Sequence, residues 1–287
     1  MHAGVSKAST LQDERSFYDR QYLDGGWWGR SIGSSNLDTL DFCALWQEMP
    51  GSSELLQSLG DVRGKRMLLL GNGASIKEFL FVKMGAAHVT FTDLSPAGIQ
   101  YAENHYRRSR LGTDHPECCD FRAVDLSDLP FPDSSYDVIC AEAAIHHVEH
   151  LEGALSQIYR CLAPGGYCRF ADTALSPIWQ KTKSGILRSL QRYVHRRDGI
   201  SPEDLKATTR GGYTLEETRI LCRKLGFRSY HYERIALFDY LVWRGAIRLR
   251  FPLLNSLRPF AKLLDRILAT SPIMQRQGIS LIFGFNK

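Results

Sequence analysis

The sequence predicts a doubly wound α/β fold, and three features of the chain carry that prediction. Short β-rich runs alternate with helically spaced segments over residues 66–172, which is typical of a parallel sheet covered by helices on both faces. Gly71 and Gly73 interrupt the chain directly after the first run. Asp93 and Asp125 stand at the ends of the second and third runs, where ligands bind in such sheets.

The elements follow one another in a regular order. The first five expected strands are residues 66–71, 88–94, 119–126, 136–143 and 167–173. The helices expected between them are residues 75–85, 96–112 and 151–166. Gly85 is expected to end the first helix, and Pro164, Gly165 and Gly166 to separate the last helix from its strand.

The second half of the chain completes the sheet. Residues 229–237 and 277–285 are expected to form two late strands that pair antiparallel at the sheet edge, which gives seven strands in all. Helices are expected over residues 178–197 and 214–227, and a helical insertion broken by Pro252 and Pro259 over residues 238–268. The domain assignment is therefore an N-terminal helical lid (1–60), a cofactor-binding core (61–175), and a sheet completion with basic helical insertions that caps the substrate (176–287).

Composition excludes several classes of protein. The chain has 287 residues, 44% of them hydrophobic, which supports a sizeable core. It shows no signal-peptide pattern and no run of eighteen uncharged apolar residues, so a cytoplasmic protein is expected, with a peripheral membrane location as an alternative. The seven cysteines form no CxxC pair, so reduced thiols and no metal site are expected.

Positive charge is concentrated in the second half. Residues 180–287 carry 21 Lys and Arg against 8 Asp and Glu, a balance of +13, which leaves −8 for residues 1–179. The insertion interleaves arginines and lysines with a set of apolar residues. These apolar residues are Tyr240, Trp243, Leu249, Phe251, Leu254, Phe260 and Leu264.

Three explanations of this insertion stay open: an anionic membrane surface, a pocket for a phosphorylated or lipid-linked substrate, and a solvated helix pair packed on the sheet or on a second subunit. No RNA-binding signature is present, so no nucleic-acid partner is expected. The sequence leaves the oligomeric state undetermined.

The glycine turn indicates a ligand without phosphate. It departs from G-x-G-x-x-G at Ile76 and lacks the Gly-Lys-Ser/Thr ending of a P-loop. Asp93 follows Gly73 by twenty positions, where a carboxylate can accept hydrogen bonds from both hydroxyls of a ribose. A role of Asp93 as a helix N-cap is the alternative.

Four motifs together resemble those of class I S-adenosylmethionine-dependent methyltransferases of the small-molecule, type 11-like group. They are "LLLGNGAS", "VTFTDLS", "AVDLSDLPFPDSSYDVICAEAAIHHV" and "LAPGGYCRFAD", in that order over residues 65–173. The resemblance implies a Rossmann-like core with S-adenosyl-L-methionine as cofactor. It departs from the family pattern at Leu69 and Ser75, where an acidic residue and a glycine are usual.

The resemblance also implies a role for each matching position. The glycine turn, including Asn72, would approach the methionine part and the ribose, and Asp93 would hold the ribose. Tyr22 would close a lid with Tyr18, with plain cover of the core as the alternative for this segment. Around the adenine and the methionine group it implies a further set of residues: Leu94, Asp125, Leu126, Ala141 and Glu142.

Candidate catalytic residues lie beyond the fourth and fifth strands. His146 and His147 are suited to accept a proton at neutral pH, and Asp172 to orient one of them. A base is needed only where the acceptor carries a proton, and Glu142 is an alternative base. A structural or cofactor-edge role for at least one of the two histidines is the competing interpretation.

The expected function is methyl transfer to a small-molecule acceptor, a hydroxyl first and an amine or carbon next. Two alternatives remain. One is a peripheral membrane methyltransferase that acts on a lipid or a lipid-linked glycan. The other is a non-catalytic cofactor-binding scaffold, which the departure at Leu69 suggests.

Overall fold

We analysed a computed structural model of the chain, which describes residues 7–23, 37–148, 150–173, 215–235, 238–249, 252–268, 271 and 280–287. The helix expected over residues 178–197 lies outside the described residues. So do Arg250 and Phe251 of the basic insertion.

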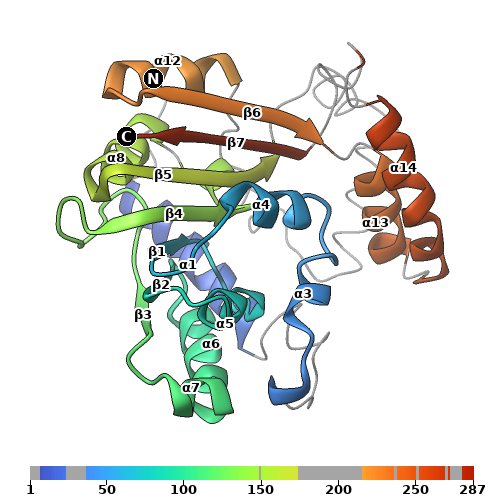
Figure 1. Ribbon diagram of the computed structural model, residues 1–287, viewed down its shortest axis with the longest axis horizontal. Coiled ribbons are helices and arrows are strands. Elements are labelled where there is room, and N and C mark those ends of the chain that lie inside the picture. Colours follow the sequence, from blue (N-terminus) through green and yellow to red (C-terminus); the bar gives the residue numbers. More distant parts are fainter. Residues whose placement is uncertain are drawn as a thin grey trace.

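The described strands form one seven-stranded sheet in the order β3-β2-β1-β4-β5-β7-β6 (Figure 1). Their bounds are β1 Arg66–Leu70, β2 His88–Asp93, β3 Cys119–Ala123, β4 Tyr136–Glu142, β5 Leu162–Thr173, β6 Ser229–Ile235 and β7 Ser280–Asn286. Strands β1 to β5 pair in parallel with one another, whereas β7 runs antiparallel between β5 and β6. The predicted fold class and the antiparallel pairing of the two late strands are confirmed.

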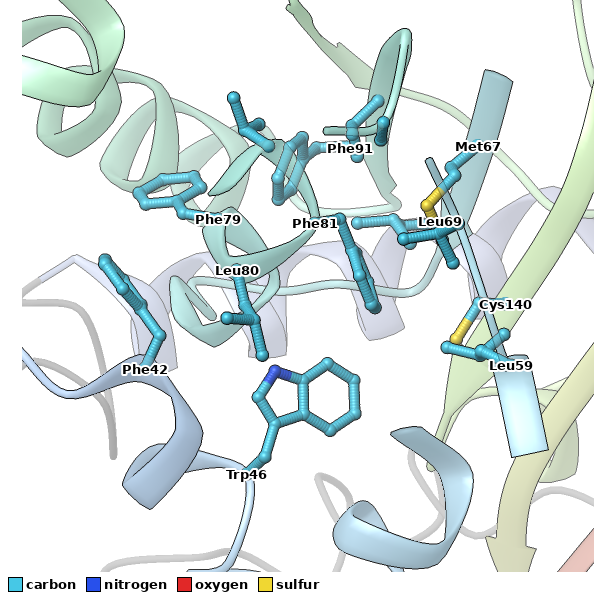
Figure 2. Close-up of a cluster of buried hydrophobic side chains, with 14 of the residues drawn as sticks. Phe42, Trp46, Leu59, Met67, Leu69, Phe79, Leu80, Phe81, Phe91 and Cys140 are labelled. Carbon is cyan, nitrogen blue, oxygen red and sulfur yellow. The ribbon is translucent and has the colours of Figure 1, made fainter. Parts of the chain in front are cut away.

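Alternate residues of the central strand serve two separate cores. Met67 and Leu69 of β1 pack in one buried cluster, and Leu68 and Leu70 in the other, because successive side chains of a strand point to opposite faces. The first cluster is formed with the 3-10 turn η2 (Lys77–Phe79) and the helices α3 (Phe42–Leu45), α4 (Ser52–Leu59), α5 (Leu80–Lys83) and α6 (Pro96–Arg108). Figure 2 shows this cluster, in which the Trp46 ring packs against Phe81 at a centroid distance of 5.4 Å.

On the other face, α8 (Leu151–Cys161) and α12 (Leu215–Leu225) cover β4, β5 and β7. The sheet is therefore covered on both sides. The chain before it adds α1 (Lys7–Tyr22) and the 3-10 turn η1 (Leu37–Thr39). The seven cysteines are all free thiols, and four of them are buried.

Three element boundaries differ from the prediction. The helix expected over residues 75–85 is reduced to η2 and α5. The helix expected over 96–112 stops at Arg108, because Ser109 accepts the N–H of Gly112 with its side chain and so begins a new helix, α7 (Arg110–Asp114). Residues 162–166 belong to β5 and do not precede it, since Leu162 already pairs with Tyr136 before the register shift.

Two helices form a pair beyond the sheet. They are α13 (Phe238–Leu249) and α14 (Arg258–Leu268), joined by the 3-10 segment η4 (Pro252–Leu257). Figure 1 shows the pair, in orange and red, on the side toward which β4 and β5 point. The helical insertion is interrupted before α14 by η4, which begins at Pro252, whereas Pro259 does not break the chain and lies in the first turn of α14. Among the described helices, none is long and apolar enough to cross a membrane.

Candidate active site

The turn after β1 contacts both the end of β2 and the loop after β4 at the edge of the sheet. Gly71 and Gly73 have φ of 64° and 56°, a conformation that glycine adopts at little cost. A Cβ on Gly71 would lie 2.3 Å from the Cβ of Ala144, so the loop after β4 packs directly on the turn. The backbone N–H of Asn72 donates to the carbonyl of Thr92 in β2 (2.8 Å), and its side chain donates to the Ser75 carbonyl (2.9 Å).

Asp93 ends β2 with a buried carboxylate. One of its oxygens accepts the N–H of Gly73 (2.7 Å), and the other accepts that of Ser95 (2.8 Å). Burial raises the pKa of Asp93 to about 6, although these backbone hydrogen bonds favour the ionised form. The N-cap of α6 is Ser95, whose hydroxyl accepts the N–H of Gly98. The interpretation of Asp93 as that N-cap is therefore wrong.

A first cavity of about 120 Å³ lies at this edge of the sheet. Its walls combine three carboxylates, those of Glu14, Asp93 and Asp125, with apolar surfaces and with the α1 helix. The lining residues include Asp93, Leu94, Asp125, Leu126, Val148, His147, Gly71, Tyr18 and Tyr22. The carboxylates can accept hydrogen bonds from an uncharged polar group of a ligand, and the apolar side chains can pack against a flat apolar ring beside it.

Helix α1 covers this cavity with two tyrosines. The rings of Tyr18 and Tyr22 are stacked at 5.7 Å, and burial raises the pKa of both hydroxyls. Tyr22 lies against the glycine turn, since a Cβ on Gly73 would lie 2.7 Å from the tyrosine hydroxyl. The hydroxyl of Tyr18 is 3.1 Å from Nε2 of His147.

A second cavity of about 380 Å³ adjoins the first, because Tyr22, Gly71 and Ala143 line both. Ala143 has a φ of 53°, which is unusual for a residue with a side chain and is frequent at functional sites. The remaining lining includes Asn72, Ser75, Lys77, Glu78, Ala141, Glu142, Trp46 and Trp243.

The second cavity contains a buried lysine. The Lys77 ammonium is paired with Glu142, donates to Ser52 (3.2 Å) and lies 4.6 Å from the centre of the Trp46 ring. Burial lowers its pKa, but the charges of Glu142 and Glu78 outweigh this and leave the pKa raised. The lysine is therefore held as a cation.

Glu78 is the second unusual charge in this cavity. Burial raises its pKa to about 7, in spite of the nearby Lys77. The hydroxyl of Ser75 donates to Glu78 (2.6 Å). The cavity thus offers charges of both signs close together.

His146 and Asp172 form a tight pair. Oδ1 of Asp172 is 2.5 Å from Nδ1 of His146, and Oδ2 accepts the backbone N–H of His146 (3.1 Å). Burial lowers the pKa of His146, but the charge and hydrogen bond of Asp172, together with Glu14, raise it overall. His146 and His147 have ring centres 4.0 Å apart.

Most of the sequence-predicted site residues come together at the two cavities. Asp93, Leu94, Asp125, Leu126 and His147 line the first, Asn72, Ala141 and Glu142 the second, and Gly71 and Tyr22 both. Gly73 lies under Tyr22. His146, which is adjacent to His147, and its partner Asp172 line neither of these two cavities.

Sequence reasoning missed Lys77, Glu78, Ser52 and Trp46, and it named Trp243 only as part of the apolar pattern of the insertion. A signal existed for the first two, because "SIKEFLF" places adjacent charges in a segment that packs against the sheet. Ser52, Trp46 and Trp243 come from distant segments without a motif, so tertiary structure alone brings them here.

Known proteins resemble this chain over its central part. Residues 68–170 match the family model described as a methyltransferase domain. The probable phthiotriol/phenolphthiotriol dimycocerosates methyltransferase 2 of Mycobacterium ulcerans is 36% identical over 116 residues, which are 39% of this chain and 41% of that protein. The demethylmenaquinone methyltransferase of Tropheryma whipplei is 27% identical over 183 residues, 62% of this chain and 72% of that protein. The chain thus spans about two fifths of the length of the first relative.

Solved structures share the fold. An S-adenosylmethionine-dependent methyltransferase from Mesorhizobium loti has a TM-score of 0.57 at 19% identity and covers 84% of this chain and 100% of its own. Haemonchus contortus phosphoethanolamine N-methyltransferase 2, in complex with S-adenosylhomocysteine, has a TM-score of 0.61 at 18% identity and covers 95% of this chain and 59% of its own. At these identities the likeness concerns the fold.

Proposed function

We propose that this chain, whose residues 68–170 form a methyltransferase domain with the class I S-adenosylmethionine-dependent fold, transfers a methyl group from S-adenosylmethionine to a small-molecule acceptor. One observation carries the proposal: two cavities of different character meet at Gly71, Ala143 and Tyr22. A cofactor with a nucleoside at one end and an amino acid at the other matches that arrangement.

The nucleoside end is assigned to the first cavity. Asp93 would accept the ribose hydroxyls, Asp125 the adenine amino group, and Leu94 and Leu126 would lie against the ring. The described lining residues combine carboxylates with no Lys or Arg, which favours an uncharged sugar and base over a dinucleotide. The cavity lining supports this assignment.

The amino-acid end is assigned to the second cavity. A methionine group carries one ammonium and one carboxylate, and Lys77, Glu78 and Glu142 supply charges of both signs in a buried place. Buried charges need such partners. The departures from the family pattern at Leu69 and Ser75 are thus offset by charges that lie further along the chain.

The cofactor supplies a methyl group already activated by a positively charged sulfur, so the protein has mainly to align the acceptor and exclude water. We assign water exclusion to Tyr18 and Tyr22 of α1, which cover the glycine turn. The lid role remains a proposal that the burial of both tyrosines supports.

For an acceptor with a hydroxyl group, we assign proton acceptance to His146, which lines neither cavity itself but has its ring centre 4.0 Å from that of His147 in the wall of the first cavity. Asp172 fixes Nδ1 of His146, which leaves Nε2 as the atom that accepts a proton. His147, which bonds to Tyr18 and lines the first cavity, is assigned to the cofactor edge. An acceptor that arrives unprotonated at the reacting atom would need no base.

The acceptor is proposed to have an apolar body. Trp46, Met49, Leu55 and Trp243 contribute to the wall of the second cavity. Two relatives are named for acceptors of related character, phthiotriol dimycocerosates and demethylmenaquinone. A hydroxyl or activated carbon on an apolar molecule is therefore the proposed target.

The test is a transfer assay with methyl-labelled S-adenosylmethionine and solvent extracts of the producing cells. We expect label to enter an apolar compound with the native protein and to fall at least about tenfold with Asp93→Ala, which removes charge-assisted hydrogen bonds. Asp114→Ala, which removes an exposed carboxylate, is the matched control and should retain activity. Binding of S-adenosylhomocysteine without transfer to any fraction would instead establish the non-catalytic scaffold.

A further inference from the structure

Helix α14 presents its apolar side chains to solvent. Phe260, Leu263 and Ile267 are 69%, 52% and 66% exposed, whereas Ala261 and Asp265 on the opposite side are buried. These three positions share one face of the helix, because residues three and four apart are neighbours. A helix on a water-soluble domain normally buries that face.

Buried polar contacts hold α14 in this orientation. Asp265 accepts the backbone N–H groups of Phe238 and Asp239 at the start of α13 (3.0 and 2.9 Å). Arg258 donates to both oxygens of Asp239 (2.7 and 2.9 Å) and to the carbonyl of Glu48 (2.7 Å). Turning the apolar face inward would leave these groups unpaired, which is costly.

The neighbouring segment extends the exposed face. Leu253 and Leu257 of η4 are 69% and 52% exposed. We call the five side chains the docking face: Leu253, Leu257, Phe260, Leu263 and Ile267. Lys262 and Arg266 belong to the same helix, one turn apart, and Arg266 is exposed.

We propose that the docking face lies on the surface of a lipid bilayer that contains anionic lipids. Exposed apolar patches of this kind mark interaction sites, and an amphipathic helix with basic residues beside its apolar face is suited to an interface. The positive charge of Lys262 and Arg266 favours an anionic lipid surface over a second copy of the chain as the partner. Two copies that met through their docking faces would bring four positive side chains together, whereas lipid phosphates would neutralise the charge of Lys262 and Arg266.

The docking face is connected to the site through α13. Trp243 of α13 lines the second cavity, and α13 is joined to α14 through Asp265 and Arg258. An apolar acceptor dissolved in the bilayer would thus be close to the cavity. This last step rests on the proposed function, but bilayer binding itself does not.

The experiment is vesicle co-sedimentation of the full chain, without cofactor, on vesicles of equal parts phosphatidylcholine and phosphatidylglycerol. We expect binding that weakens at high salt. Phe260→Glu with Leu263→Glu should lower the partition coefficient at least about tenfold. Lys262→Gln with Arg266→Gln should lower it about fivefold for each charge removed, and vesicles of phosphatidylcholine alone should show no such charge effect.

Matched controls are placed on α12, where Ile220 is 56% exposed. Ile220→Glu and Arg223→Gln should bind vesicles like the native chain. The proposal would be overturned if these control variants lost as much vesicle binding as the docking-face variants, or if the native chain did not bind the vesicles. It would also be overturned if the native chain formed a dimer that Phe260→Glu dissociates. Titration of the same samples with S-adenosylhomocysteine separates the two proposals, because vesicle binding without cofactor binding would contradict only the proposed function.

Discussion

The carboxylate of Asp172 accepts hydrogen bonds from both the backbone N–H and the ring Nδ1 of His146. The raised pKa of His146 has two consequences of known sign. The pair makes its full contribution to the free energy of unfolding below about pH 6.5, the pKa of a histidine in the unfolded chain. This contribution is lost as pH rises through the raised pKa of His146 in the folded protein. A role as proton acceptor needs the neutral ring, so turnover should rise with pH through the same raised value.

We therefore expect Asp172→Asn to shift the acidic limb of the rate profile to lower pH and to reduce the stability advantage at acidic pH. Steady-state rates between pH 5 and 9 and urea unfolding at the two ends measure both effects. The matched control is Asp120→Asn, which disturbs a surface pair with His88 at 3.6 Å. If the acidic limb of the rate profile stays at the same pH in Asp172→Asn, His146 is not the proton acceptor.

Asp93 predicts a pH-dependent affinity. Its pKa of about 6, raised by burial, lies above its ordinary value of about 3.9. The folded protein therefore favours the protonated carboxyl, and the contribution of this group to the free energy of unfolding is lost as pH rises through 6. Ribose hydroxyls favour the ionised form instead. Affinity for S-adenosylhomocysteine should consequently fall about tenfold from pH 7 to pH 5, where about one tenth of Asp93 is ionised.

Calorimetric titration at the two pH values measures this change. Asp125→Asn should lower affinity at both values without altering their ratio, whereas Asp93→Asn should remove the pH dependence. An affinity of the native chain that is constant between pH 5 and 7 would contradict the placement of the ribose at Asp93.

Among the elements, the glycine turn after β1 is the most constrained. Gly71 combines a positive φ with a Cβ position 2.3 Å from Ala144, so Gly71→Ala adds a clash to backbone strain. Gly64 has a similar φ of 70° with nothing within 4 Å of a Cβ. We expect Gly64→Ala to lower the free energy of unfolding by about 1 kcal/mol and Gly71→Ala by about 2–4 kcal/mol, as measured by urea denaturation. Equal losses would contradict the packing of the β4 loop on the turn.

Element types were predictable from the sequence where periodicity was regular. The β-rich runs and the turn residues between them predicted seven strands and the antiparallel pairing of the last two. Boundaries were less accessible, because Ser109 divides one expected helix through a local hydrogen bond and residues 162–166 pair in β5 despite a proline and two glycines.

Side-chain exposure in the α13–α14 pair was not predictable from spacing. Of the apolar residues that the pattern selected, Tyr240 is buried and Phe260 is exposed. The docking face is set by Asp265 and Arg258, two polar residues that face inward. The outward orientation of the apolar face depends on contacts between distant segments, so the spacing of apolar residues along one helix does not predict it.

At the scale of the whole molecule, the motif-bearing half and the basic half contribute differently to the site. The first supplies the sheet edge, the glycine turn and the carboxylates, which the sequence identified by position. The second supplies Trp243 and, through α13 and α14, a surface beside the cavity. The acceptor side of the site is therefore the part that the motifs do not describe.

The central claim is that the two adjoining cavities hold one S-adenosyl cofactor. Calorimetric titration of the purified chain with S-adenosylhomocysteine at pH 7.5, with NAD as the control ligand and Asp93→Ala as the control variant, tests it most directly. We expect micromolar binding of S-adenosylhomocysteine, at least about tenfold weaker binding by Asp93→Ala, and no heat with NAD. Absence of binding by the native chain, or equal affinity for NAD, would contradict it.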